Sequence, residues 1–258
     1  MSKIKGGVEN QRNNNVFSLN ETLLWITVLA MTALSVWADR KFGVVFFFLV
    51  IIILVNGNAK RIYSVKFHGA VLFLRRSCYV FPLFLPLLLP GFGLSAISDL
   101  RFLPLGLIGG ILFLAPKQKE YRLMLSRDFI IMGGGPKTKT DGFTSIYMQA
   151  GAAAGEEVFF RGFIIGYLYV NGSLAFSLFL VALSSILFFM NHFGLKWGAS
   201  FSLYDCVIQI AFGAVSGALF IFSGSILPGV IMHLIYNSPH IVLEVKKMYT
   251  VFDGQRGD

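Results

Sequence analysis

The sequence has little charge for its length. Asp, Glu, Lys and Arg make up 14% of the 258 residues, whereas soluble domains carry about 25%. Hydrophobic residues make up 55%, and the mean hydropathy is +0.70. This composition excludes a soluble globular domain and a disordered chain, and it indicates an integral membrane protein.

Cysteine is also scarce. The two cysteines, Cys78 and Cys206, lie in apolar runs and form no CxxC pair, which excludes a disulfide-stapled secreted domain. The 27 Phe and 27 Gly are typical of helical membrane bundles, in which apolar side chains face lipid and small residues let helices approach closely. The formal charge of +9 comes from short basic loops between apolar runs, so we expect no nucleic-acid partner.

The apolar runs predict an all-α, polytopic bundle of about eight transmembrane helices, since a spanning helix needs about 20 apolar residues. The predicted spans are residues 22–38, 42–55, 77–97, 102–115, 143–170, 173–193, 206–222 and 226–245. The second and fourth runs are short, so re-entrant or tilted segments are alternatives there. Residues 22–38 have a second interpretation as a cleavable signal peptide, which leaves the later spans unchanged.

Lysine and arginine are distributed unequally between the two sides of this predicted bundle. Arg40, Lys41 and Arg101 fall on one side, and nearly all the others fall on the side of the two tails. The positive-inside rule therefore predicts a multi-pass protein of the cell membrane with both termini cytoplasmic. The expected units are a tail (1–21), a four-helix region (22–115), a cytoplasmic basic loop with an amphipathic segment (116–142), a second four-helix region (143–245) and a tail (246–258).

Two features predict departures from straight spans. Pro82, Pro86 and Pro90 recur at four-residue spacing in the third span, where each removes a backbone donor and favours a kink. Residues 117–127 mix apolar side chains with charged ones, so we expect this segment to lie on the cytoplasmic surface.

Charged and polar residues cluster in the last four spans, where they are costly and therefore functional candidates. Glu157 and Arg161 are four residues apart on one helical face, which favours an ion pair and leaves a purely structural role as an alternative. Glu156 points about 100° away, and the residue four positions after it is Phe160. Without a local partner, Glu156 is a candidate general base.

Two histidines accompany this group, each on its own span. His192 ends the sixth span, and His233 in the eighth is followed four residues later by Asn237, on the same face. We predict no functional role for His68, in a basic loop, or for His240, near a helix end. Asp205 is expected to be a cap or an interfacial residue.

The sequence lacks the other common motifs of membrane proteolysis. It contains no complete GxSxG, no GxGD pair and no HExxH. What remains is activation of water by a carboxylate and histidines. Glu156, His192 and His233 could hold zinc with one open position, and a metal-free glutamate–histidine pair explains the same residues, so no cofactor is required.

Three motifs in the second half resemble those of the CPBP family of intramembrane proteases, which comprises CAAX proteases and bacteriocin-processing enzymes and is also called the Abi family. The family patterns EExxxR, FxxxH and HxxxN resemble Glu156-Glu157-x-x-x-Arg161, Phe188-x-x-x-His192 and His233-x-x-x-Asn237. Their order on three membrane helices of the second half is more specific than any one pattern alone. The resemblance covers residues 143–245.

The resemblance implies hydrolysis of a peptide bond inside the membrane, near the cytoplasmic face. It implies that Glu156 is the general base and activates water together with His192. His233 and Asn237 would polarise the scissile carbonyl, and Glu157 and Arg161 would position the site or the substrate. The expected partners are the lipid bilayer and a prenylated, leader-bearing or membrane-embedded peptide or protein.

Two other functions stay open from the sequence. A non-catalytic immunity or scaffold protein would keep the fold without the chemistry. A proton-coupled transporter also uses buried Glu, His and Arg, but should show inverted repeats, whereas here the polar groups occupy only the second half.

The depths of the two histidines present a geometric difficulty. His192 lies near the cytoplasmic end of its span, whereas His233 follows Ser225 by eight residues from the opposite side, about 12 Å in. For the two to meet, either the connection at residues 223–225 sinks into the bundle or the helices tilt.

Overall fold

The computed structural model describes residues 19–62, 68–90, 92, 100–132, 138–169, 173–195 and 203–253, and within them all regular secondary structure is helical. This confirms the predicted all-α class. Residues 1–18 of the expected N-terminal tail, 93–97 of the third predicted span and 254–258 of the C-terminal tail lie outside the described residues.

The helices of the first half lie in the outer part of the bundle. They are α1 (Leu19–Trp37), α2 (Lys41–Asn58), α3 (His68–Val80), α4 (Leu103–Leu114), α5 (Gln118–Met124) and α6 (Arg127–Met132). Short 3-10 segments adjoin them: η1 (Ala59–Arg61), η2 (Phe81–Leu88), η3 (Leu100–Phe102) and η4 (Ala115–Lys117).

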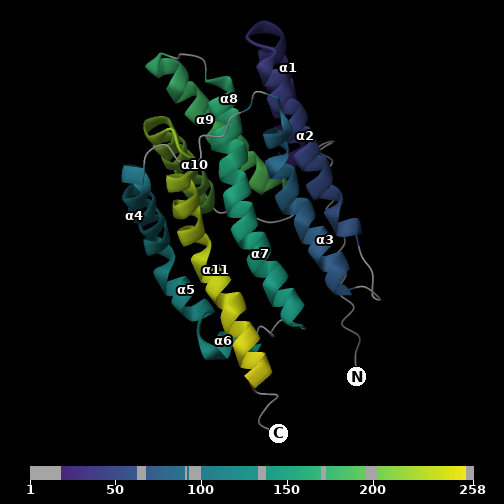
Figure 1. The fold of residues 1–258 in the computed structure, drawn as a ribbon, viewed down its shortest axis with the longest axis vertical. Helices are drawn as coiled ribbons and strands as arrows, with labels where there is room; N and C mark the ends of the chain where they lie inside the picture. Colours follow the sequence, from purple (N-terminus) through teal and green to yellow (C-terminus); the bar gives the residue numbers. More distant parts are fainter. Residues whose placement is uncertain are drawn as a thin grey trace, which may run out of the picture.

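The second half forms the centre and one side of the bundle. Its elements are α7 (Lys139–Glu156), the π-helical segment η5 (Glu157–Ile165), α8 (Gly166–Leu168), α9 (Leu174–Leu195), α10 (Leu203–Ser223) and α11 (Leu227–Asp253). Helix α7 lies in the middle, between α3 and α11 (Figure 1), and contacts both. Thr138 begins α7 with a capping box, in which its hydroxyl accepts from the Asp141 N–H and its own N–H donates to the Asp141 carboxylate.

Five helical segments of the described chain are long and apolar enough to cross a membrane. They are Lys41–Asn58, His68–Leu88, Leu100–Met124, Leu174–His192 and Leu203–Ser223, with a shorter apolar helix at Ile26–Trp37. The segments α7–α8 and α11 are not among the five, because the glutamates, arginine, histidines and asparagine that they carry lower their hydropathy. The fold is thus a membrane-type helical bundle, as predicted.

Three helix boundaries differ from the predicted ones. The third helix begins at His68 rather than at 77, because Arg75 and Arg76 continue the helix instead of ending it. The fourth continues through η4 and α5 to Met124, so Lys117 falls within this apolar segment rather than starting a separate surface segment. Helix α11 extends to Asp253, beyond the predicted end at 245.

The third helix changes its hydrogen-bond pattern where the prolines recur. α-Helical hydrogen bonding ends at Val80, and the segment Phe81–Leu88, which contains Pro82 and Pro86, is a 3-10 helix. Proline cannot donate to the carbonyl four residues earlier, so the tighter helix replaces the α-helix where the prolines recur.

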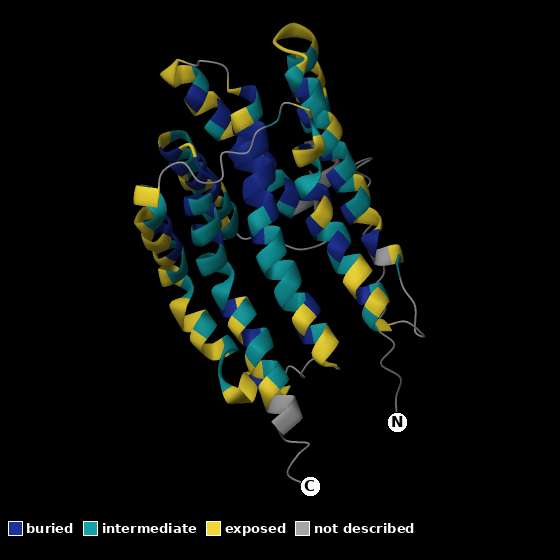
Figure 2. Cartoon of the chain, in the orientation of Figure 1, coloured by how far each residue is buried: buried dark blue, intermediate teal, exposed yellow. Residues whose placement is uncertain are grey.

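The most deeply buried part of the chain is η5 (Figure 2). Phe159, Phe160 and Phe163 are all 0% exposed. The Phe160 ring meets Phe188 of α9 edge to face, with centroids 5.4 Å apart. This aromatic core fixes the segment that follows Glu156.

Close contact between α4 and α11 depends on glycine. A Cβ atom at Gly106 would collide with the carbonyl oxygen of Pro228, and one at Gly110 would collide with the side chain of Ile235. Small residues let membrane helices approach until their backbones touch. The first half therefore helps to place α11, which carries His233 and Asn237.

Candidate active site

The two glutamates lie where the seventh helix changes its hydrogen-bond pattern. Glu156 is the last α-helical residue, and Glu157 is the first of the nine π-helical residues. Such π-helical insertions frequently occur at functional sites. The Ser184 hydroxyl donates to the carbonyl oxygen of Phe160 at 2.6 Å, so one backbone acceptor of η5 is satisfied from α9.

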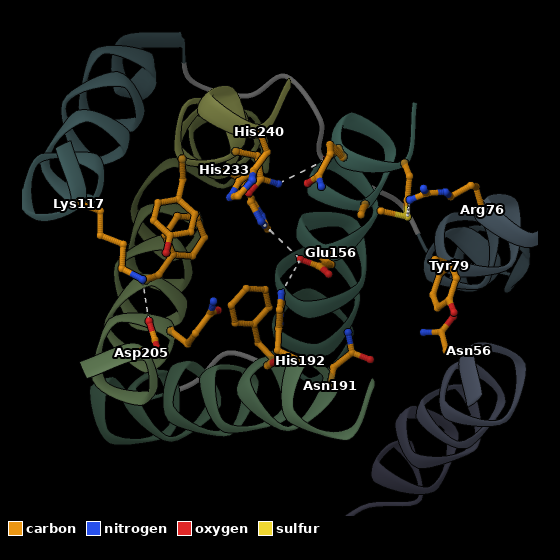
Figure 3. Close-up of a pocket in the computed structure, with 18 of the residues that line it drawn as sticks. Asn56, Arg76, Tyr79, Lys117, Glu156, Asn191, His192, Asp205, His233 and His240 are labelled. Carbon is orange, nitrogen blue, oxygen red and sulfur yellow. Dashed lines mark hydrogen bonds and ion pairs between the residues drawn. The ribbon is translucent and has the colours of Figure 1, made fainter. Parts of the chain in front are cut away.

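Glu156 and the two predicted histidines converge, as Figure 3 shows. The Oε2 atom of Glu156 lies 3.5 Å from Nε2 of His233 and 3.7 Å from Nε2 of His192. The three side chains come from α7, α9 and α11. Helix packing thus brings together three residues that lie far apart in the sequence. All three line one cavity of about 1020 Å³.

The connection between α10 and α11 resolves the difference in depth between the histidines. Ser225 is 2% exposed and Ile226 is 6% exposed, whereas Gly224 is exposed, so the connection is buried in part. The Ser223 hydroxyl donates to the Leu219 carbonyl oxygen at 2.6 Å and accepts from the Ser225 N–H at 3.1 Å, which satisfies polar groups that burial removes from solvent. This partial burial favours the first of the two expected solutions, the sunken connection.

The hydrogen-bond partners of Nδ1 in the two histidines determine which ring atoms face Glu156. Nδ1 of His192 lies 3.0 Å from the carbonyl oxygen of Phe188, and Nδ1 of His233 lies 3.1 Å from Oε1 of Glu157. A carbonyl or carboxylate oxygen only accepts, so each Nδ1 carries the proton. Nε2 of each ring therefore faces the Glu156 carboxyl. In a neutral ring it accepts from a water molecule placed between them, and in a doubly protonated ring it donates to the carboxylate or to a bound oxyanion.

Glu157 and Arg161 form a fully buried ion pair behind His233. Nη1 of Arg161 lies 3.3 Å from Oε1 of Glu157, and both side chains are 0% exposed. Nη2 of Arg161 donates to the Gly213 carbonyl at 3.3 Å, and its guanidinium stacks over the Phe188 ring at 4.6 Å. Neither Glu157 nor Arg161 lines the cavity, so the pair acts on the site through His233.

Ser216 of α10 completes this network. Its hydroxyl donates to Oε2 of Glu157 at 2.5 Å. The same oxygen would collide with any Cβ at Gly229, which explains the glycine on the facing turn of α11. Sequence reasoning missed Ser216, although a hydroxyl in an otherwise apolar span is a signal for such a role.

We expect Ser216→Ala to destabilise the protein by about 1–3 kcal/mol, because it leaves a buried carboxylate oxygen without its donor. Unfolding by dodecyl sulfate in mixed micelles measures the free energy. Ser185→Ala is the matched control, since the Ser185 hydroxyl donates to the backbone carbonyl oxygen of Val181 in its own helix rather than to a buried carboxylate. Equal losses for both variants would contradict the assigned role of Ser216.

Asn237 lines the same cavity as His233, in agreement with their shared helical face. Its Nδ2 donates to the backbone carbonyl of Gln149 at 3.5 Å, a long bond that ties α11 to α7. All six predicted site residues are therefore gathered around one point, with four of them in the cavity wall and two behind it.

The cavity also contains residues to which the sequence analysis gave no role at the site. The Lys117 ammonium lies 2.7 Å from Oδ1 of Asp205 and joins the segment before α5 to α10 across one wall (Figure 3). His240 lines the cavity and meets the ring of Tyr121 at 6.1 Å. Asp205 is thus more than an interfacial residue, whereas His68 lies elsewhere, exposed and 3.1 Å from Asp141.

Zinc ligation by Glu156, His192 and His233 stays an alternative from the sequence. Among the described residues, no group of three or more His, Cys, Asp and Glu side chains is arranged to hold a metal ion. This includes Glu156, His192 and His233, the three that sequence reasoning considered for zinc.

Comparison with known families and proteins gives one match. Residues 140–239 match the family model described as type II CAAX prenyl endopeptidase Rce1-like. No curated protein and no solved structure matches the chain. The matched range runs from the first turn of α7 to Pro239 of α11 and contains all six predicted site residues. Residues 140–239 are therefore similar to the Rce1-like type II CAAX prenyl endopeptidase family, and this confirms the family resemblance of the three motifs.

Proposed function

We propose that this protein is an intramembrane endopeptidase that hydrolyses a peptide bond with a water molecule activated by Glu156 and His192. One observation carries the proposal: the Glu156 carboxylate faces Nε2 of both histidines at 3.5 and 3.7 Å in a shared cavity. The match to an endopeptidase family supports the reaction class.

In the proposed reaction, Glu156 removes a proton from the water held between it and His192. The resulting hydroxide attacks the scissile carbonyl carbon, and the oxyanion accepts hydrogen bonds from Asn237 Nδ2 and from His233 in its doubly protonated form. The proton on Glu156 then passes to the leaving amine. A positioned general base contributes about 10²–10⁴-fold and an oxyanion donor about 10²–10³-fold, so amide hydrolysis needs both.

We assign a supporting role to the buried pair behind the cavity. Glu157 accepts from His233 Nδ1, and Arg161 and Ser216 hold Glu157 in place. This orientation directs the other ring nitrogen of His233 toward Glu156 and the cavity. A carboxylate that orients a catalytic imidazole in this way is a recurrent feature of hydrolytic sites.

The orientation of the bundle follows from its basic residues. Arg40 and Lys41 join α1 to α2, and Arg101 precedes α4, all at the upper end of the bundle in Figure 1. The opposite end carries the first turn of α7 and the last turns of α11, with Lys246 and Lys247. By the positive-inside rule, we infer that this lower end faces the cytoplasm.

The test of the proposed function is cleavage by the full chain in phosphatidylcholine proteoliposomes. The substrate mixture contains a prenylated peptide, a leader-bearing peptide and a membrane-embedded peptide, and mass spectrometry identifies the products. We expect His192→Gln to lower the cleavage rate at least tenfold, because the water loses one of its two bases. His68→Gln is the matched control, since that histidine lies outside the cavity.

Cleavage at an unchanged rate by a folded His192→Gln variant would contradict the proposed mechanism. Absence of cleavage by the wild type on all three substrate classes would favour the non-catalytic alternative. Near-wild-type activity of His68→Gln would show that the loss of activity in His192→Gln comes from the position of His192, and not from replacing a histidine as such.

A further inference from the structure

The part of the cavity wall formed by α3 carries an arginine that has no acidic partner among the described residues. Arg75 and Arg76 of α3 are both partly buried and both line the cavity. Within the described residues, no carboxylate oxygen lies within 4.0 Å of the Arg76 guanidinium. The nearby acids are engaged elsewhere, Glu244 with Lys247 at 3.1 Å and Asp141 in the cap of α7.

The hydrogen bonds that Arg76 makes are weak ones. Nη1 donates to the sulfur of Met148 at 3.0 Å, and Nη2 donates to the hydroxyl of Ser145 at 3.2 Å. The third nitrogen, Nε, is buried and has no hydrogen-bond partner in the part of the chain that the structure describes. A thioether is a poor acceptor, whereas a carboxylate accepts two parallel bonds from a guanidinium. A ligand carboxylate would therefore satisfy Arg76 better than its present neighbours do.

Two buried amides occupy the same cavity. Asn56 is 4% exposed and Asn191 is 3% exposed, and in each the Oδ1 atom has no hydrogen-bond partner among the described residues. Both line the cavity, together with Arg76 (Figure 3). Unpaired buried acceptors are rare in folded proteins, and the backbone N–H groups of an extended peptide are suitable donors for them.

The spacing along α7 relates Arg76 to the hydrolytic residues. Met148, which contacts Arg76, and Glu156 both line the cavity and are eight positions apart on α7, a rise of about 12 Å. An extended peptide advances about 3.3 Å per residue, so this distance corresponds to about three to four substrate residues.

We propose that Arg76 is a specificity-determining residue that binds a carboxylate of the peptide substrate about three to four residues from the cleaved bond. The inference rests on the proposed function. Arg75, the neighbouring cation in the cavity, increases the positive potential of this subsite. The carboxylate is either the C-terminal one or that of an Asp or Glu side chain, and the two sources share the same recognition chemistry.

The experiment compares three forms of one peptide, the best-cleaved member of a synthetic library, in proteoliposomes of full-length protein. The forms are the free acid, its C-terminal amide, and the free acid with Asp and Glu replaced by Asn and Gln. For the wild type, we expect loss of the recognised carboxylate to lower kcat/KM about 10- to 100-fold, mainly through KM. The form that loses activity identifies the source.

Three variants complete the design. Arg76→Gln should cleave all three forms with similar kcat/KM, because it no longer distinguishes the carboxylate. Arg76→Lys should retain part of the preference, since it keeps the charge without the planar fork. Arg122→Gln, an exposed arginine of α5 outside the cavity, should behave as the wild type.

Each other outcome overturns the inference. Equal cleavage of all forms by the wild type leaves the proposed function intact and refutes the carboxylate subsite. A uniform loss for all forms in Arg76→Gln would mean a structural role. An effect of Arg76→Gln that appears only in vesicles with phosphatidylglycerol would mean a lipid contact. If no peptide is cleaved in a Glu156-dependent way, the proposed function fails and this inference fails with it.

Discussion

We expect Glu156→Gln to lower the rate of peptide cleavage by about 10²–10⁴-fold, the contribution of a positioned general base. Glutamine has the size and shape of glutamate and can occupy the position 3.5 Å from His233 and 3.7 Å from His192. Its amide cannot take a proton from water. The effect should therefore appear in kcat, with little change in KM, because substrate contacts elsewhere in the cavity are retained.

Glu120→Gln is the matched control for this variant. Glu120 lies on α5, is exposed and does not line the cavity, so the same chemical change there should leave cleavage near the wild-type rate. A Glu156→Gln protein that is folded and cleaves at the wild-type rate would show that Glu156 is not the base. If cleavage persisted in the corresponding His192 variant as well, the mechanism would be wrong as a whole.

The second large effect concerns stability. We expect Arg161→Met to destabilise the protein by about 3–5 kcal/mol, because it leaves the fully buried Glu157 carboxylate without its cation. Methionine fills a similar volume, so the loss of stability arises from the unpaired charge of Glu157 more than from a cavity. The measurement is the free energy of unfolding by dodecyl sulfate in mixed micelles.

A double variant separates the charge effect from packing. Glu157→Gln combined with Arg161→Met removes both charges, and it should recover part of the stability that Arg161→Met loses. Lys247→Met provides the comparison with a partly exposed pair, Lys247 and Glu244 at 3.1 Å, for which we expect less than about 1 kcal/mol. A loss from Arg161→Met as small as that of Lys247→Met would contradict the buried-pair interpretation.

The predicted fold follows from composition because a bilayer leaves few choices. Apolar runs without charge must form helices, since unpaired backbone groups are too costly in hydrocarbon. The boundaries were less predictable. Arg75, Arg76 and Lys117 interrupt the apolar runs and predict loops, whereas in the structure they lie within helical segments and face a cavity.

The candidate site could be predicted in part because its motifs are local. The spacing of Glu157 and Arg161 places both on one helical face, and their ion pair is observed at 3.3 Å. The spacing of His233 and Asn237 likewise places both in the cavity wall. Ser216 and Arg76 could not be found in this way, because each meets its partners only across helix interfaces.

The sequence by itself determined that the chain is a helical membrane protein and which polar residues are too costly to be incidental. Tertiary structure decided how these residues meet. The partly buried connection after Ser223 sets the depth of His233, the π-helical segment after Glu156 lies in the aromatic core, and α3 brings Arg76 to the cavity wall. The reason is physical: helical periodicity fixes neighbours three or four residues apart, whereas contacts between helices depend on how their surfaces pack.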